Sequence, residues 1–318
     1  MDKEYGFKLD TGIAKRKKEL DILDKLRNLK SRITDLERAA TVEFGAVPDY
    51  TGPKVVVYAG TENCYKDMEL SAKTLLANSK VDKIYFLIDT DEFPTKLPEI
   101  IEAINVHDQA YYYPWCLSLL ATPSYMTMMR HALYDMFPQY DRILWLDIDT
   151  LVVDDISELF NIPLGDYYYF AAAEEDRHYL QYTSSRKILD KPEAYHDLII
   201  DNDVYFNDAV LLENLKLIRE EIGEELVNHL NNYLVYYCDQ SLLNNSCRDR
   251  IYRLSNVYNT SHCTNDMDFR KAKILHMSNA RKTIEMESLI GIYDEVSFEQ
   301  IMEWRAKREK AGVLSGKK

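Results

Sequence analysis

The chain has 318 residues, enough to bury the core of one large domain. Hydrophobic residues make up 46% of it and aromatic residues 12%, which excludes an intrinsically disordered chain. The formal net charge of −14 repels nucleic acids and anionic membranes at long range, so we expect no nucleic-acid partner.

The cysteines and the apolar runs indicate where the protein resides. Five cysteines are spread along the chain without a Cys-x-x-Cys pair, which favours reduced thiols over a disulfide scaffold or a zinc site. No apolar run approaches the length of a membrane-spanning helix, and the N-terminus has no apolar leader segment. We therefore expect a cytoplasmic protein with no membrane span.

Two segments flank the body of the chain. Residues 12–40 carry apolar side chains every three or four positions among many charges, which predicts a helix. This helix, within an N-terminal segment of residues 1–49, either forms a homo-oligomer or packs on its own domain. A loop rich in glycine and proline separates it from the body. Residues 286–318 are expected to form a C-terminal helix, over about 297–311, and a tail.

The body begins with alternating strands and helices. Residues 54–59 predict a buried strand and residues 67–78 a helix. A second buried strand is expected over residues 83–88, and residues 96–104 are expected to form a helix. This alternation predicts an α/β domain with a mostly parallel central sheet over residues 50–285. In such sheets, ligands bind at the carboxyl ends of the strands.

The next helix and strand lead to the most informative pair of residues. Apolar side chains between Met128 and Phe137 form one face of a helix that Pro138 ends. The strand that follows stops abruptly at Asp147 and Asp149. At a turn, these two carboxylates can converge on one hard cation such as Mg²⁺ or Mn²⁺, which brings a phosphorylated substrate. Alternatively, the two aspartates only end the strand and begin the turn.

Four further segments stand in a specific order around this pair. They are Ala-Gly-Thr-Glu-Asn-Cys-Tyr at residues 59–65, Tyr-Phe-Asn-Asp-Ala-Val-Leu-Leu at residues 205–212, Asp-Gln-Ser-Leu-Leu-Asn at residues 239–244, and Ile-Leu-His-Met-Ser-Asn-Ala-Arg-Lys at residues 274–282. The second is expected to be a strand entering a helix, the third the start of a helix, and the fourth a short strand entering a loop. Together the motifs resemble glycosyltransferase family 8, which includes glycogenin-like and lipooligosaccharide galactosyltransferase-like enzymes.

The resemblance covers about residues 54–285 and implies one nucleotide-binding domain of the GT-A type. Such enzymes transfer a hexose from a UDP-sugar with retention of configuration, using Mn²⁺, with Mg²⁺ as a substitute. The resemblance implies that Asp147, Asp149 and His276 bind the metal. It assigns donor binding to Ala59, Thr61, Asn63, Tyr65, Arg130, Asp147, Ile148, Asn207 and Lys282. Among these, Tyr65 is expected to stack on uracil and Lys282 to hold the diphosphate.

The catalytic residues that the resemblance implies are Asp239 and Gln240, which match positions around the donor sugar. Retention allows two routes through an oxocarbenium-like transition state. Either Asp239 forms a covalent glycosyl intermediate, or the acceptor attacks the face from which UDP departs while Gln240 stabilises the cation. The chain departs from the family pattern at Asp208-Ala209, at Asn279 and at Thr283-Ile284. These departures bear on the sugar and on the C-terminal loop, and they leave the metal ligands in place.

The expected donor is UDP-glucose or UDP-galactose, and the expected acceptor is a glycan, a glycolipid head group or a protein. Two other classes of function stay open at this point. One is a sugar nucleotidyltransferase, although such enzymes need a glycine-rich phosphate loop and residues 59–62 are a poor one. The other is a non-catalytic protein that binds a nucleotide-sugar or serves as a scaffold.

Overall fold

The computed structural model describes the greater part of the body of the chain. The described residues are 50–90, 92, 95–106, 125–174, 205–226, 238–261, 270–277 and 284–314. The expected N-terminal helix, with the homo-oligomer it could form, and Lys282 lie outside these ranges. The predicted domain boundaries therefore stay predictions.

A single large sheet forms the centre of the molecule. Its strands follow the order β3-β2-β1-β4-β8-β6-β7, and β9 pairs with β6. The first four are β1 (Val55–Gly60), β2 (Lys83–Ile88), β3 (Ile101–Asn105) and β4 (Ile143–Leu146). They are mutually parallel, with Val56 of β1 opposite both Ile84 of β2 and Leu144 of β4. The predicted strands at residues 54–59 and 83–88 are confirmed, as is the mostly parallel sheet.

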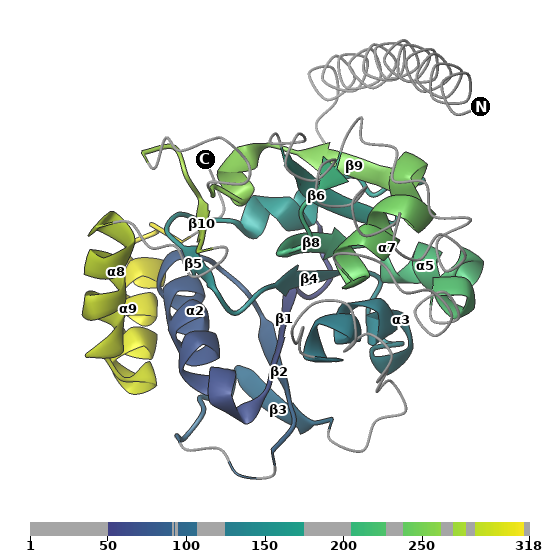
Figure 1. Ribbon diagram of the computed structural model, residues 1–318. Helices are drawn as coiled ribbons and strands as arrows, with labels where there is room; N and C mark the ends of the chain where they lie inside the picture. Colours follow the sequence, from purple (N-terminus) through teal and green to yellow (C-terminus); the bar gives the residue numbers. More distant parts are fainter. Residues whose placement is uncertain are drawn as a thin grey trace, which may run out of the picture.

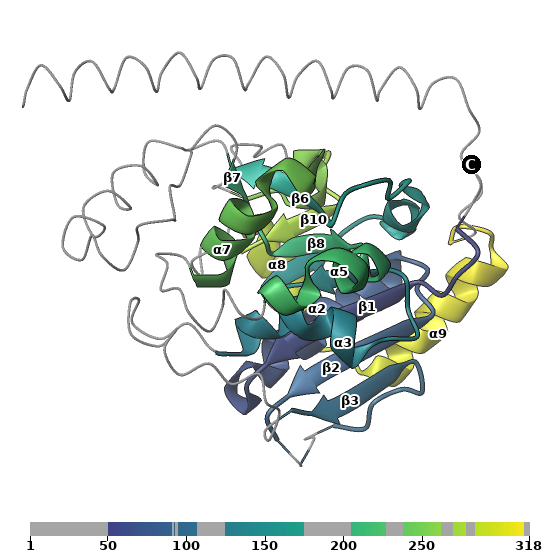
Figure 2. The same cartoon turned by 90° about the vertical axis from the view of Figure 1, so that its right-hand side faces the viewer.

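The other half of the sheet is mixed in direction. Its strands are β6 (Tyr169–Glu174), β7 (Tyr205–Phe206), β8 (Val210–Glu213) and β9 (Ile251–Leu254). β8 is antiparallel to β4 and β6, whereas β9 is parallel to β6. A separate pair, β5 (Thr150–Val152) and β10 (Ile274–His276), runs antiparallel. Figure 2 shows β3, β2 and β1 side by side at one end of the molecule and β6 with β7 at the other.

Helices cover both faces of the sheet (Figure 1). On one side lie α2 (Tyr65–Asn78), α8 (Ile284–Asp294) and α9 (Phe298–Lys310). On the other lie the 3₁₀ helix η3 (Tyr125–Ala132), α3 (Leu133–Met136), α5 (Leu215–Glu221) and α7 (Cys238–Cys247). Alternate β1 residues face the two sides: Val56 shares a core with Met68 of α2, and Val57 shares one with Leu133 of α3. Since α2, α9 and the strands bury one core together, the C-terminal helices belong to the same packed body.

Short 3₁₀ helices complete the described connections. They are η1 (Glu62–Cys64), η4 (Ser157–Asn161), η6 (Arg248–Arg250) and η7 (Asn256–Tyr258). η1 joins β1 to α2, and η7 leads from β9 toward β10. Both therefore lie at strand ends, where the site residues gather.

Two expectations from the sequence were wrong. The helix expected over residues 96–104 is instead the edge strand β3, because Ile101–Asn105 pairs in register with β2. The segment 205–212 is not one strand entering a helix but two short strands, β7 and β8, separated at Asn207–Ala209. The helix begins only at Leu215, and the break between the strands turns the Asn207 side chain toward α7.

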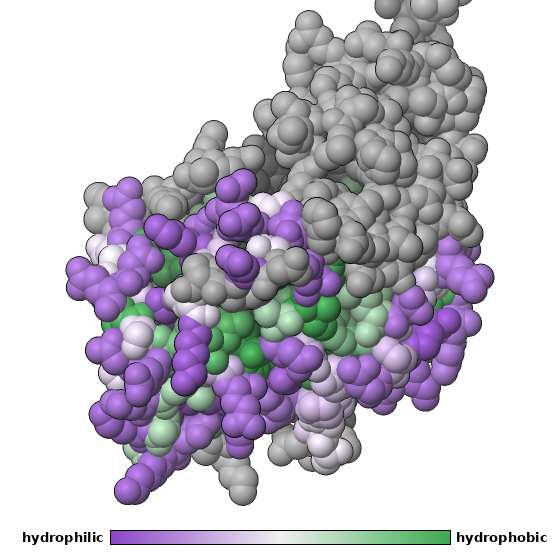
Figure 3. Space-filling model, turned by 90° about the horizontal axis from the view of Figure 1, so that it is seen from below, coloured by the Kyte–Doolittle hydropathy of each residue, from purple (hydrophilic) through white to green (hydrophobic). Residues whose placement is uncertain are grey.

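Seen from below, hydrophilic side chains surround a band of apolar ones (Figure 3). Among the described residues, no helix combines the length and the apolar character that crossing a membrane requires.

Candidate functional site

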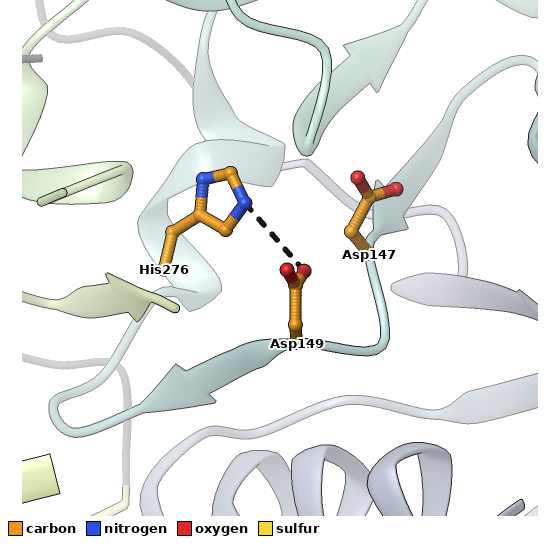
Figure 4. A group of neighbouring side chains, drawn as sticks. All are labelled: Asp147, Asp149 and His276. Atoms are coloured by element: carbon orange, nitrogen blue, oxygen red, sulfur yellow. Dashed lines mark ion pairs between the residues drawn. The ribbon is translucent and has the colours of Figure 1, made fainter. Parts of the chain in front are cut away.

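The site begins where β4 ends. The chain leaves the sheet at Asp147, and a tight turn leads into β5 at Thr150. The turn is held by the backbone bond from the Thr150 N–H to the Asp147 carbonyl, 3.2 Å, and by the Thr150 hydroxyl donating to the same carbonyl, 2.7 Å. Because β10 pairs with β5, His276 lies opposite Thr150 and beside the turn. Figure 4 shows the three side chains as neighbours, with the ion pair between His276 and Asp149 marked by a dashed line.

Asp147, Asp149 and His276 form a group that can hold a metal ion. One ligand atom from each residue lies within 4.8 Å of the others, and His276 Nε2 is 3.5 Å from Asp149 Oδ1. The histidine is buried, whereas the Asp147 and Asp149 side chains are 26% and 38% exposed, which leaves an open side for a ligand. Two carboxylates and an imidazole fit a divalent cation of intermediate hardness. The three residues expected to bind metal are thus brought together.

The pKa of Asp149 is already suited to metal binding. Burial acts to raise this pKa, but the positive charge that His276 carries when protonated, and the hydrogen bond it then donates, outweigh burial, so the net pKa of Asp149 is lowered. A carboxylate that is ionised at neutral pH needs no proton to be displaced before it binds a cation. The electrostatics therefore agree with the geometry.

Arg130 forms a second centre just behind the first. Its side chain is only 2% exposed and contacts three carboxylates. Nη2 lies 3.0 Å from Asp147, Nη1 lies 3.0 Å from Asp208, and Nε lies 2.9 Å from Asp239. The guanidinium also stacks 4.7 Å from the Trp145 ring centre, and the Trp145 indole N–H donates to Asp147 Oδ1 at 2.7 Å. Asp147 therefore belongs both to the candidate metal ligands and to the carboxylates around Arg130.

The charges around Arg130 do not balance. Burial opposes a charge on Arg130, but the three surrounding carboxylates outweigh it and raise its pKa, so the guanidinium stays protonated. Burial raises the pKa of Asp208 well above its usual value and also raises that of Asp239, despite the attraction of Arg130. One guanidinium cannot fully neutralise three carboxylates. Asp208 and Asp239 therefore favour their protonated, neutral forms.

The residues expected around the sugar lie next to this centre. Asn207 follows β7, and its Nδ2 donates to Gln240 Oε1 of α7 at 3.2 Å. The backbone N–H of Asp208 donates to the same oxygen at 3.3 Å. Asp239 precedes Gln240 in the first turn of α7. The structure thus brings Arg130, Asn207, Asp239 and Gln240 beside the metal-type group.

The turn after β1 lies on the other side of Asp147–Asp149. Ala59 ends β1 with Gly60, and Thr61 and Asn63 are accessible at η1. A Cβ added at Gly60 would come within 3.7 Å of Ile148, so the turn and the Asp-x-Asp segment are neighbours. Tyr65 begins α2, is 5% exposed and hydrogen bonds to Thr95 through its hydroxyl.

The structure adds residues that the sequence did not single out. Asn259, which is fully buried, hydrogen bonds both Asn207 and His276. Asp89, just after β2, accepts a hydrogen bond of 2.9 Å from the Glu62 backbone N–H in the turn after β1. Neither residue carries a local motif, and only the position of Asp89 at the carboxyl end of a predicted strand could have suggested it.

Comparison with solved structures shows which fold this is. The WbbM bifunctional glycosyltransferase matches with a TM-score of 0.60 and 18% identity, over 83% of this chain and 53% of that one. The galactosyltransferase LgtC, solved in complex with donor and acceptor sugar analogues, matches with a TM-score of 0.55 and 20% identity, over 80% of this chain and 99% of that one. The chain therefore has the GT-A fold of these glycosyltransferases, as expected.

Sequence comparison gives the family. The chain is 29% identical over 209 residues to the "Probable glycosyl transferase Gly" of Streptococcus gordonii, covering 61% of this chain and 27% of that protein. It spans between 24% and 47% of the length of the curated relatives that it matches. The sequence profile of glycosyl transferase family 8 matches residues 55–283, well over half of the chain. The protein belongs to glycosyltransferase family 8.

Proposed function

We propose that the protein is a retaining hexosyltransferase that takes its sugar from a UDP-sugar. The observation that carries this proposal is the group Asp147–Asp149–His276, which lies at the carboxyl end of β4 next to the turn after β1. In open α/β sheets this is where a nucleotide ligand binds. UDP-glucose or UDP-galactose is the favoured donor, and a glycan, a glycolipid or a protein is the favoured acceptor.

Mn²⁺ is the proposed ion, with Mg²⁺ as a substitute, because the resemblance to the family implies it and carboxylate ligands suit both ions. A divalent cation there would neutralise charge that develops on the departing diphosphate. Asp147, Asp149 and His276 would hold it, while Lys282 would add a further positive charge to the diphosphate. Arg130 holds one oxygen of Asp147 at 3.0 Å and so fixes the direction of the other.

Donor binding is proposed for the turn after β1 and the segment beside it. Ala59, Thr61 and Asn63 offer accessible groups to a uridine, and Ile148 adjoins them. The ring of Tyr65 is only 5% exposed, so stacking on uracil would require its neighbours to shift.

We favour attack from the face where UDP leaves, because Asp239 is poorly suited to act as a nucleophile. In that route the bond from the anomeric carbon to the β-phosphate oxygen breaks as the acceptor oxygen bonds to that carbon. The acceptor proton passes to the leaving phosphate oxygen. Asp239 is the alternative nucleophile, but Arg130 holds its Oδ2 at 2.9 Å and burial raises its pKa. A carboxyl that is paired with Arg130 and favours its neutral form is a weak nucleophile. We therefore assign Asp239 to sugar binding and Gln240 to stabilising the oxocarbenium-like transition state.

The test is release of UDP from a panel of UDP-sugars, measured with Mn²⁺ and with EDTA and without added acceptor. We expect release from one donor, abolished by EDTA, because such enzymes leak to water. UDP-sugar formation from UTP and a sugar 1-phosphate would instead indicate a nucleotidyltransferase. Absence of release from every donor, with no Mn²⁺-dependent thermal shift from UDP, would indicate a binding or scaffold protein.

A further inference from the structure

Asn259 is a fully buried amide placed between two parts of the site. It follows η7, where its backbone N–H donates to the Asn256 carbonyl at 3.0 Å. The next residue, Thr260, is joined to β10 on both sides, donating to Ile274 at 2.9 Å and accepting from His276 at 3.0 Å. The backbone around Asn259 is therefore fastened to the strand that carries His276.

The Asn259 side chain is one link in a chain of hydrogen bonds. Asn207 Oδ1 accepts from the Ala209 backbone N–H at 3.1 Å and from Asn259 Nδ2 at 2.7 Å. Asn259 Oδ1 then lies 2.9 Å from Nδ1 of His276. At its other end the chain continues from Asn207 Nδ2 to Gln240 Oε1, which also accepts from the Asp208 backbone N–H.

Backbone donors fix the direction of every link. A backbone N–H can only donate, so the Asn207 atom bonded to the Ala209 N–H must be the amide oxygen. The Asn259 atom that faces this oxygen must then be the NH₂ group, which turns the Asn259 oxygen toward His276. An oxygen acceptor there requires the proton of a neutral imidazole to be on Nδ1. Nε2, which faces Asp149 at 3.5 Å, then keeps its lone pair.

We propose that Asn259 is the positioning residue that sets the tautomer and ring orientation of His276, so that Nε2 faces the metal position as a ligand. The proposal rests on the metal site of the proposed function. The same chain of amides orients Gln240, so Asn259 couples the metal ligand to the residue assigned to stabilising the oxocarbenium-like transition state. Partners of this kind behind a ligating histidine commonly change metal affinity by about 10- to 100-fold.

The first test reads the tautomer directly, in metal-free protein. Long-range ¹H–¹⁵N spectra of histidine-labelled protein at a pH of about 8.5 distinguish the two neutral forms. His276→Gln assigns the His276 signals by their loss. We expect Nδ1–H in the wild type and a shift toward Nε2–H, the form that free imidazole prefers, in Asn259→Leu. Nε2–H in the wild type, or an unchanged tautomer in Asn259→Leu, would overturn the proposal.

The second test measures the affinity for Mn²⁺ by electron paramagnetic resonance of the free ion. We expect Asn259→Leu to weaken binding about 10- to 100-fold. The matched control is Asn214→Ala, which removes another buried amide, the N-cap of α5, which bonds Leu217 and Tyr167. The control should keep the wild-type affinity. An equal loss of affinity in Asn259→Leu and Asn214→Ala would mean that Asn259 has only a structural role.

A third variant guards against misfolding and separates the two links. Asn259→Asp keeps an oxygen facing His276 but removes the donor to Asn207. We expect it to retain the wild-type tautomer and Mn²⁺ affinity while transfer falls, and loss of the tautomer would contradict our assignment. The tautomer and the Mn²⁺ affinity are both measured without a donor sugar. If the tautomer and the Mn²⁺ affinity depend on Asn259 but no UDP is released, this inference is supported and the proposed function is contradicted.

Discussion

Two pairs of aspartates in this site differ in what already holds them. Asp147 and Asp149 lie in a turn, with side chains 26% and 38% exposed, and they face the imidazole of His276. Asp208 and Asp239 are 6% and 5% exposed and lie against the guanidinium of Arg130. The pKa of Asp149 is lowered, whereas burial raises the pKa values of Asp208 and Asp239.

The difference shows how one residue type can serve two purposes in a small volume. The exposed pair, Asp147 and Asp149, offers carboxylate oxygens that a cation can reach, whereas burial raises the pKa values of the buried pair, Asp208 and Asp239, despite the attraction of Arg130. Asp147 belongs to both, because Arg130 and the indole N–H of Trp145 bond the same oxygen, Oδ1. Its other oxygen is not used by either of these two donors. Removing one residue from each set should therefore have different consequences.

The largest effect on activity is expected from a substitution in the exposed pair, Asp147 and Asp149. Asp149→Ala removes a ligand but no core contact, so we expect metal-dependent UDP release to fall about 10³-fold or more. The thermal midpoint without metal should stay nearly unchanged, as differential scanning calorimetry would show. Asp154→Ala is the matched control, since this exposed aspartate lies in the loop after β5 outside the ligand group. If Asp149→Ala unfolds the protein, the role of Asp149 is structural.

Removing the cation beside the buried pair should lower the free energy of unfolding. Arg130→Met leaves Asp208 and Asp239 buried without their cation, which should lower the free energy of unfolding by about 3 kcal/mol or more. Urea denaturation at neutral pH measures this loss. Arg219→Met is the control, because within the described ranges Arg219 donates only to the backbone carbonyls of Tyr134, Phe137 and Tyr140. It should cost about 1–2 kcal/mol, and equal losses in the two variants would contradict a special charge balance at Arg130.

The fold could be predicted where burial on both faces leaves a continuous apolar run. The strands at β1, β2 and β4 are of this kind, and their order predicted the parallel sheet. β3 could not be predicted, because its apolar residues fit one face of a helix as well as an edge strand. Only pairing with β2 decides between them. The break between β7 and β8 was hidden for a similar reason, since it depends on bonds to residues far along the chain.

The candidate site could be predicted only in part. Asp147 and Asp149 are visible in their own spacing, whereas His276 was found through a family resemblance and is joined to them by the pairing of β10 with β5. Asn259 had no signal, because its partner Asn207 lies 52 positions away in the sequence. The three carboxylates around Arg130 likewise come from separate segments. Contacts of this kind are set by topology rather than by local pattern.

A smaller effect is expected from Trp145, which hydrogen bonds the shared residue Asp147. Trp145→Phe keeps a ring beneath Arg130 but removes the N–H that donates to Asp147 at 2.7 Å. A lost hydrogen bond to a charged group costs about 1.5–3 kcal/mol, part of which should weaken Mn²⁺ binding by about 10-fold. Calorimetric titration with Mn²⁺ measures it. Unchanged affinity would mean that Arg130 alone fixes Asp147.

The smallest effect concerns a buried acid behind Arg130. Glu213 on β8 is 1% exposed, and burial raises its pKa well above the usual value, only partly opposed by Arg130. At a pH below about 4 the acid is neutral in both folded and unfolded chains, so it costs nothing. As the pH rises, the unfolded chain ionises first, and the wild type loses stability until the pH passes the folded pKa. Glu213→Gln has no such loss, so its stability relative to the wild type should rise by about 1–2 kcal/mol between pH of about 4 and 8. Urea denaturation across that range gives the two curves, and parallel curves would show that Glu213 is ionised in the folded protein and belongs with the charged set around Arg130.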